Sequence, residues 1–187
     1  MGSQSLVLYV LIVSCEAAFW VVLLLSLVVR YVLHREAQSR WLLLLLPLID
    51  VLLLVFTALD LKAGTTATMA HGLAAVYVGF TIAFGSIMVQ WADARFAHRF
   101  ASGTVPTRAP TVGWKVVRYD FMLWLRCIAA WLIAFALLEG LIAFIDDESI
   151  TQPLRAWYMN GFGCVFFWFL FGPAWSLVFF RRQPHDA

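Results

Sequence analysis

The chain has 187 residues, of which 63% are hydrophobic and 13% are charged, and its formal net charge is +2 at pH 7. Soluble domains carry about 45–50% apolar and about 25% charged residues. One small core could not bury this much apolar surface, so a bilayer must solvate it. The small net charge gives no indication of nucleic-acid binding, and we assign no nucleic-acid partner.

Five apolar segments are each long enough to cross a bilayer, which requires roughly 20 residues in a helix. In chain order they cover about residues 6–29, 41–60, 70–91, 120–144 and 159–180. The connections are short except for residues 92–118, where several glycines and prolines indicate irregular backbone. The sequence therefore predicts an all-α integral membrane protein, with residues 1–187 forming a single five-helix domain.

Lysine and arginine are distributed unequally between the two sides of this arrangement, which sets its orientation because positive loops stay in the cytoplasm. One side carries ten of them: Arg30, Arg35, Arg40, Arg95, Arg99, Arg108, Lys115, Arg118, Arg181 and Arg182. The other side has only Lys62 and Arg155, beside the acidic run 146–148. We therefore expect the N-terminus outside, the C-terminus in the cytoplasm, and residues 92–118 as a cytoplasmic loop of a bacterial cell-membrane protein.

The third segment carries small side chains at every fourth position. Ala75, Gly79 and Ala83 follow His71 at this interval, so the four residues share one face of a helix. Small residues let membrane helices approach closely, so we expect this packing stripe to contact a neighbour and the third helix to be central.

Two further segments have a specific prediction. Residues 91–100 mix basic and aromatic side chains, which is typical of an interfacial continuation of the third helix that touches lipid headgroups. In the fifth segment, Gly172–Pro173 predicts a kink, because proline lacks a backbone donor and clashes with the preceding turn.

Five ionisable residues interrupt the apolar segments: Glu16, Asp50, Asp60, Arg126 and Glu139. A central charge costs about 2.5–3.5 kcal/mol on insertion scales, so such residues usually face the bundle interior and pair with one another. With a rise of about 1.5 Å per residue, Glu16 and Asp50 lie near mid-depth, and Arg126 lies roughly 9 Å to the cytoplasmic side. We therefore expect Arg126 to pair with Asp50 or Glu16.

A second group is expected towards the outer face. Glu139 is about 140° around the helix from Arg126, so we group it with Asp60 and His71. Metal binding by this group is the less favoured alternative, because a lone histidine is more often a hydrogen-bonded polar residue. We assign no metal and no other cofactor.

The two groups allow three interpretations of function. In the favoured one, buried polar groups fix helix pairing, and the chain is a non-enzymatic structural or accessory membrane component. The alternatives are a small proton- or cation-coupled transporter that uses the carboxylates, and a lipid-handling protein or enzyme with an outer-leaflet site. No GxSxG, HExxH or P-loop motif occurs, so no reaction is indicated. The expected partner is the lipid bilayer, with a second copy of the chain or another membrane subunit as further candidates.

A family resemblance appears in the first half of the chain. Residues 15–33 (CEAAFWVVLLLSLVVRYVL), the stretch from Ile49 through Asp60, residues 64–71 (GTTATMAH) and residues 84–93 resemble the YmcC-type bacterial membrane proteins. In the second half only the hydrophobic outline is similar. The resemblance implies a small multi-pass protein of the bacterial cytoplasmic membrane, and its motifs are tied to no known chemistry.

Overall fold

The computed structural model describes residues 3–33, 35–100, 109–110 and 113–180, and the described side chains do not include that of Glu16. The described residues form helices joined by short connections, with no β-strand among them. In chain order the elements are α1 (Ser3–Tyr31), α2 (Glu36–Lys62), α3 (Met69–Phe100), α4 (Trp114–Ile145), α5 (Glu148–Thr151), the 3₁₀ turn η1 (Gln152–Arg155), α6 (Ala156–Phe169), the π-helical turn η2 (Leu170–Ala174) and α7 (Trp175–Val178). The predicted all-α architecture is confirmed.

Four helical stretches are long and apolar enough to cross a membrane: residues 37–62, 69–99, 114–145 and 148–178. In α1, the residues 20–31 form a shorter apolar stretch. The last stretch runs through α5, η1, α6, η2 and α7, so it begins eleven residues before residue 159, where the sequence placed it.

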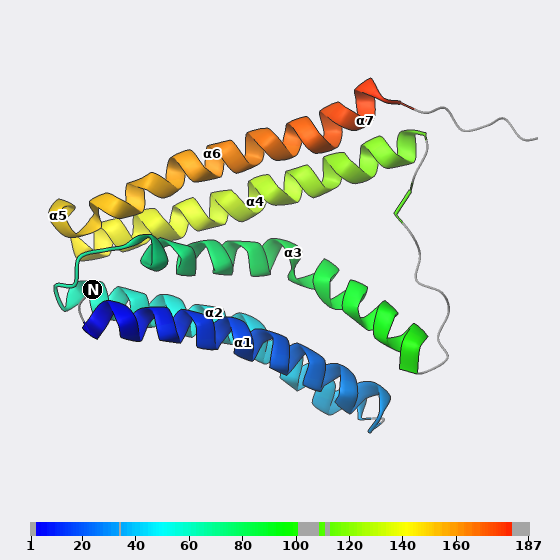
Figure 1. Cartoon of the computed structure of the whole chain (residues 1–187), viewed down its shortest axis with the longest axis horizontal. Helices are drawn as coiled ribbons and strands as arrows, with labels where there is room; N and C mark the ends of the chain where they lie inside the picture. The colour runs from blue at the N-terminus through cyan, green and yellow to red at the C-terminus, as the bar shows by residue number, and fades with distance from the viewer. Residues whose placement is uncertain (1–2, 34, 101–108, 111–112, 181–187) are drawn as a thin grey trace, which may run out of the picture.

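Helix α3 occupies the middle of the molecule (Figure 1). It contacts α1 and α2 on one side and α4 and α6 on the other, which is the central position that its small residues predict. Halfway along its length α3 changes direction, and the pair Gly85–Ser86 lies there in the sequence. Glycine and serine pairs are a recognised cause of helix bends.

The packing stripe on α3 lies against the backbone of α4. Ala75 and Gly79 are buried, and a Cβ added at Gly79 would overlap the carbonyl oxygen of Ala130 and approach the amide nitrogen of Ala134 to 3.2 Å. Ala83 is buried one turn further along. The absence of a side chain at Gly79 therefore sets how closely the two helices approach.

The loop predicted over residues 92–118 is shorter than expected, because α3 continues to Phe100 and α4 already begins at Trp114. The helical continuation predicted for residues 91–100 is confirmed. In it, the guanidinium of Arg95 lies 4.4 Å from the ring centroid of Trp91, and Asp93 forms a 3.4 Å ion pair with Arg30. These contacts let a charged stretch remain helical, and a hydropathy pattern alone does not reveal them.

The last long helix accommodates its proline without ending. Pro173 lies inside the π-helical turn η2, and α6 and α7 continue in nearly the same direction (Figure 1). A widened turn relieves the clash between the proline ring and the preceding turn, so a π-bulge takes the place of the predicted kink.

The other end of this helix is capped by Asp147. Its side chain accepts hydrogen bonds from the backbone N–H and the hydroxyl of Ser149, at 2.9 and 2.6 Å. These bonds hold the pKa of Asp147 below its ordinary value, because they stabilise the carboxylate.

Candidate functional site

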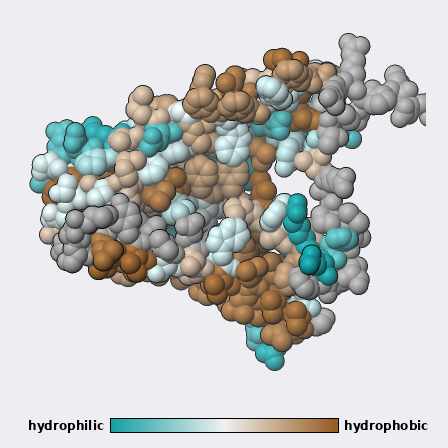
Figure 2. Space-filling view, in the orientation of Figure 1, coloured by the Kyte–Doolittle hydropathy of each residue, from teal (hydrophilic) through white to brown (hydrophobic). Residues whose placement is uncertain are grey.

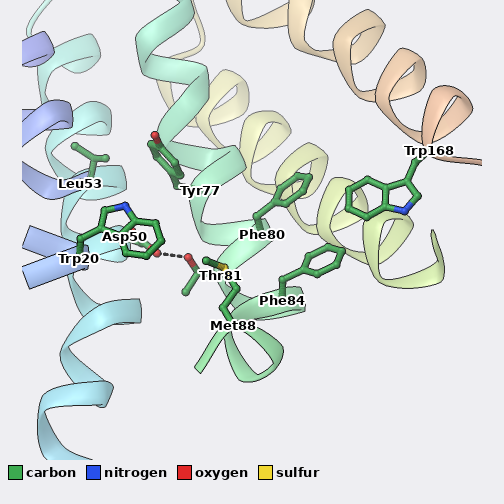
Figure 3. A pocket seen from close by; sticks show the side chains of 10 residues that line it. Trp20, Asp50, Leu53, Tyr77, Phe80, Thr81, Phe84, Met88 and Trp168 are labelled. Carbon is green, nitrogen blue, oxygen red and sulfur yellow. Dashed lines mark hydrogen bonds between the residues drawn. The ribbon is translucent and has the colours of Figure 1, made fainter. Parts of the chain in front are cut away.

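Asp50 belongs to the stripe of α2 that faces the centre of the molecule. The buried residues Leu46, Asp50, Leu53 and Thr57 follow one another at intervals of four, three and four, which is the spacing of one helix face. The Asp50 side chain is therefore turned inwards, and only 7% of the residue is exposed. The hydroxyl of Thr81 on α3 donates a hydrogen bond to its Oδ2 atom (Figure 3).

Beside this hydrogen bond lies a cavity of about 310 Å³ that is partly open to the surface, which we call the Asp50 cavity. Four helices contribute to its walls, which are mostly apolar and rich in aromatic rings (Figure 3). The lining residues are Trp20, Asp50, Leu53, Tyr77, Phe80, Thr81, Phe84, Gly85, Met88 and Trp168. On one side the rings of Phe84 and Trp168 stack with their centroids 5.6 Å apart.

Of the two carboxylates predicted as alternative partners of Arg126, Asp50 is not its partner. The guanidinium of Arg126 donates to the carbonyl oxygen of Ala83 at 2.8 Å, and among the described side chains it has no carboxylate partner. The physical reason is the position of α3, which lies between α2 and α4 and supplies Thr81 to the aspartate. The expected pairing of Arg126 with Glu16 involves a side chain outside the described residues.

Thr81, the partner of Asp50, is not among the site residues predicted from the sequence. The available signal was its position, because Thr81 is a polar residue at mid-length of an apolar helix, as Asp50 is. A hydroxyl that faces a carboxylate across two helices is one way for membrane proteins to satisfy such a group.

The outer group is built around His71, which has no exposed surface. Its Nδ1 atom accepts a hydrogen bond from the backbone N–H of Thr68 at 3.0 Å, so in the neutral ring the proton lies on Nε2. This Nε2–H faces Oδ2 of Asp60 at 3.1 Å, and the hydroxyl of Thr65 donates to Oδ1 of Asp60 at 3.2 Å. The three side chains hold the end of α2 against the start of α3.

The predicted place of Glu139 in this group is wrong. Its Oε1 atom accepts a 2.6 Å hydrogen bond from the hydroxyl of Tyr158 on α6, and no described hydrogen bond joins Glu139 to Asp60 or His71. Among the described residues, no three histidine, cysteine, aspartate or glutamate side chains are placed to hold a metal ion.

A tryptophan closes the outer group. The indole of Trp157 donates to the carbonyl oxygen of Met69 at 3.2 Å, and a Cβ added at Gly72 would overlap its ring. The ring therefore covers the first turn of α3, where His71 lies. The two polar groups thus differ in their surroundings: in the outer one His71 is covered while the Asp60 side chain is 29% exposed, and Asp50 lies beside a cavity.

A helical chain with several apolar helices long enough to span a bilayer, and with several polar side chains buried between them, is a multi-pass membrane protein. The protein YmcC of Bacillus subtilis (strain 168), described as an uncharacterized membrane protein, is 46% identical to the chain over 145 residues, which cover 77% of each of the two chains. The chain therefore belongs to the YmcC family, which confirms the resemblance seen in its first half. No family model and no solved structure matches it.

Proposed function

We propose that this protein is a non-enzymatic accessory component of the bacterial cytoplasmic membrane that binds a small membrane-soluble molecule in the Asp50 cavity. The observation that carries the proposal is a cavity of about 310 Å³ with apolar walls and one buried carboxylate. Ligand pockets typically measure about 300–1,000 Å³ and combine apolar walls with a few polar groups that fix the orientation of the ligand.

The proposal includes five spans, with the N-terminus outside and the C-terminus in the cytoplasm. The 29 residues of α1 give it a length of about 43 Å, which exceeds the roughly 30 Å of a hydrocarbon core. The end of α1 with Arg30, the end of α3 with Arg95 and Arg99, and the basic start of α4 lie at the same end of the molecule, which supports a cytoplasmic location for that end (Figure 1). At the opposite end, hydrophilic residues gather around α5 (Figure 2).

Filling the cavity tests the proposal. Gly85 lines the cavity, and a Cβ added there would meet only the methyl group of Thr81, at 3.8 Å, so Gly85→Leu can extend into the empty space. The matched control is Gly140→Leu on α4, because a Cβ at Gly140 meets nothing within 4 Å. Two small aromatic probes serve as ligands, neutral tert-butylbenzene and cationic phenyltrimethylammonium, and binding is measured as the rise in the thermal unfolding midpoint of the protein in lipid nanodiscs.

We expect at least one probe to raise the midpoint of the wild type and of Gly140→Leu and to leave that of Gly85→Leu unchanged. An equal effect of both probes on all three proteins would show that they act on the lipid alone, and the proposal would be wrong.

A cation- or proton-coupled carrier is the second candidate function. It is favoured by Asp50, a carboxylate near the middle of α2 for which the described residues offer no ion pair. A carrier predicts that Asp50→Asn still folds but loses pH-dependent cation flux in proteoliposomes. Unchanged flux in this variant would exclude a carrier role for Asp50.

A further inference from the structure

The chemistry of the Asp50 cavity indicates which molecules it can select, and this inference rests on the proposed function. Besides Asp50, the walls include five aromatic rings, those of Trp20, Tyr77, Phe80, Phe84 and Trp168 (Figure 3). Aromatic faces carry negative partial charge and attract cations within about 6 Å of the ring centroid. The aromatic rings and the carboxylate therefore both favour a positively charged ligand.

No described basic side chain pairs with Asp50 to balance a negative charge on it. Its described hydrogen bond comes from the neutral hydroxyl of Thr81, and Arg126, the intramembrane arginine, donates to the carbonyl oxygen of Ala83 instead. An unpaired carboxylate in a low-dielectric interior is strongly unfavourable, and a cation in the adjacent cavity would offset that cost.

The same walls disfavour a bare metal ion. Hard cations such as Ca²⁺ and Mg²⁺ take about six to eight oxygen ligands, and among the described side chains that line the cavity only Asp50, Thr81 and Tyr77 offer oxygen atoms. A cation whose charge is surrounded by methyl or aryl groups needs no such ligand shell, and it gains from contact with rings and aliphatic side chains.

We infer that the Asp50 cavity binds a monovalent organic cation with apolar substituents, of the tertiary or quaternary ammonium class. In this arrangement Asp50 supplies the counter-charge, the rings of Phe80, Phe84 and Trp168 contact the substituents, and the partly open side admits the ligand.

The two probes of the cavity experiment test this assignment, because phenyltrimethylammonium and tert-butylbenzene have nearly the same shape and differ in charge. We expect Asp50→Asn to weaken the binding of phenyltrimethylammonium at least about tenfold and to change that of tert-butylbenzene less than about threefold. Asp50→Glu, which keeps the charge, should recover most of the loss. Affinities come from the dependence of the unfolding midpoint on probe concentration in nanodiscs.

A second variant keeps the test decisive if Asp50→Asn does not fold. Phe84→Leu keeps an apolar side chain and removes one aromatic ring. It should weaken the binding of the ammonium probe several-fold more than the binding of the neutral probe. If the variants that fold weaken the binding of both probes equally, or weaken the binding of neither, the cation assignment is wrong. The cavity would then remain a binding site for apolar molecules, whether neutral or cationic. If the wild type binds neither probe, the proposed function itself fails.

Discussion

Asp50 illustrates how a carboxylate can stand in the apolar run of a membrane helix without an arginine beside it. It lies on the inward face of α2, it accepts a hydrogen bond from Thr81, and its other side borders a cavity. A single neutral hydroxyl satisfies only part of the hydrogen-bonding capacity of a carboxylate. The residue is thus held in place by α3 and still has capacity to bind a ligand.

His71 has the opposite character, because both of its ring nitrogens already have partners. We predict that His71→Phe lowers the free energy of unfolding by about 2–4 kcal/mol, since it strands the backbone N–H of Thr68 and weakens the bonding of Asp60. The measurement is the thermal unfolding midpoint in detergent. Tyr158→Phe is the control, because it removes one hydrogen bond from an exposed glutamate and should cost less than about 1 kcal/mol. A His71→Phe protein as stable as the wild type would show that these bonds contribute nothing.

At the residue scale, the sequence identifies the unusual polar residues better than it identifies their partners. The interruption of apolar runs identifies Asp50, Asp60 and Arg126 as unusual, and proximity along the chain brings Asp60 to His71. The partner of Arg126 depends on the rotation of α3 relative to α4, and no local pattern specifies this rotation.

At the scale of elements, the contact between α3 and α4 depends on the lack of a side chain at Gly79. We predict that Gly79→Ala destabilises the protein by about 1–3 kcal/mol, because the new methyl group overlaps the carbonyl oxygen of Ala130 and forces the helices apart. Thermal unfolding in detergent measures the loss.

The matched control for this substitution is Gly140→Ala. It makes the same chemical change on α4, where the added methyl group meets no neighbour within 4 Å. Since alanine favours a helix over glycine by about 1 kcal/mol, this variant should be as stable as the wild type or more stable. If Gly79→Ala behaved like Gly140→Ala, the close approach of α3 and α4 would not contribute to stability.

The apolar centres of the helices are predictable from sequence, and their ends are less so. Apolar length alone locates the middle of each of the four candidate spans. The ends lie in residues such as 92–100 and 148–158, where polar side chains continue the helix through ion pairs, caps and ring contacts. A helix predicted from hydropathy alone is therefore too short at such places.

At the scale of the whole molecule, the Asp50 cavity arises from helices that are far apart in the sequence. Its walls combine Trp20 of α1, Asp50 of α2, several side chains of α3 and Trp168 of α6. Apart from Asp50 and Thr81, each of these residues alone has the pattern of an ordinary apolar or interfacial position. The cavity becomes visible only when the arrangement of the helices is known, so the sequence could indicate its carboxylate and not its walls.

The orientation of the whole chain is tested with single cysteines on opposite ends of the molecule. Ser149 in α5 and Gln38 in α2 are both exposed, and they lie on the sides predicted to be outer and cytoplasmic. The native cysteines Cys15, Cys127 and Cys164 are first replaced by alanine so that each variant carries one thiol. We expect a membrane-impermeant maleimide to label Ser149→Cys in intact bacterial cells, and to label Gln38→Cys only after the membrane is permeabilised.

A tag at the N-terminus completes this test, because its side relative to Gln38→Cys reports whether α1 crosses the bilayer. Suppose that an antibody reaches the tag in intact cells while Gln38→Cys is not labelled by the maleimide. Helix α1 must then cross the bilayer, which makes it a fifth span. If tag and cysteine are found on the same side, α1 does not cross, and four helices span the membrane. If Gln38→Cys is labelled in intact cells and Ser149→Cys is protected, the excess of arginine lies outside, and the proposed orientation is wrong.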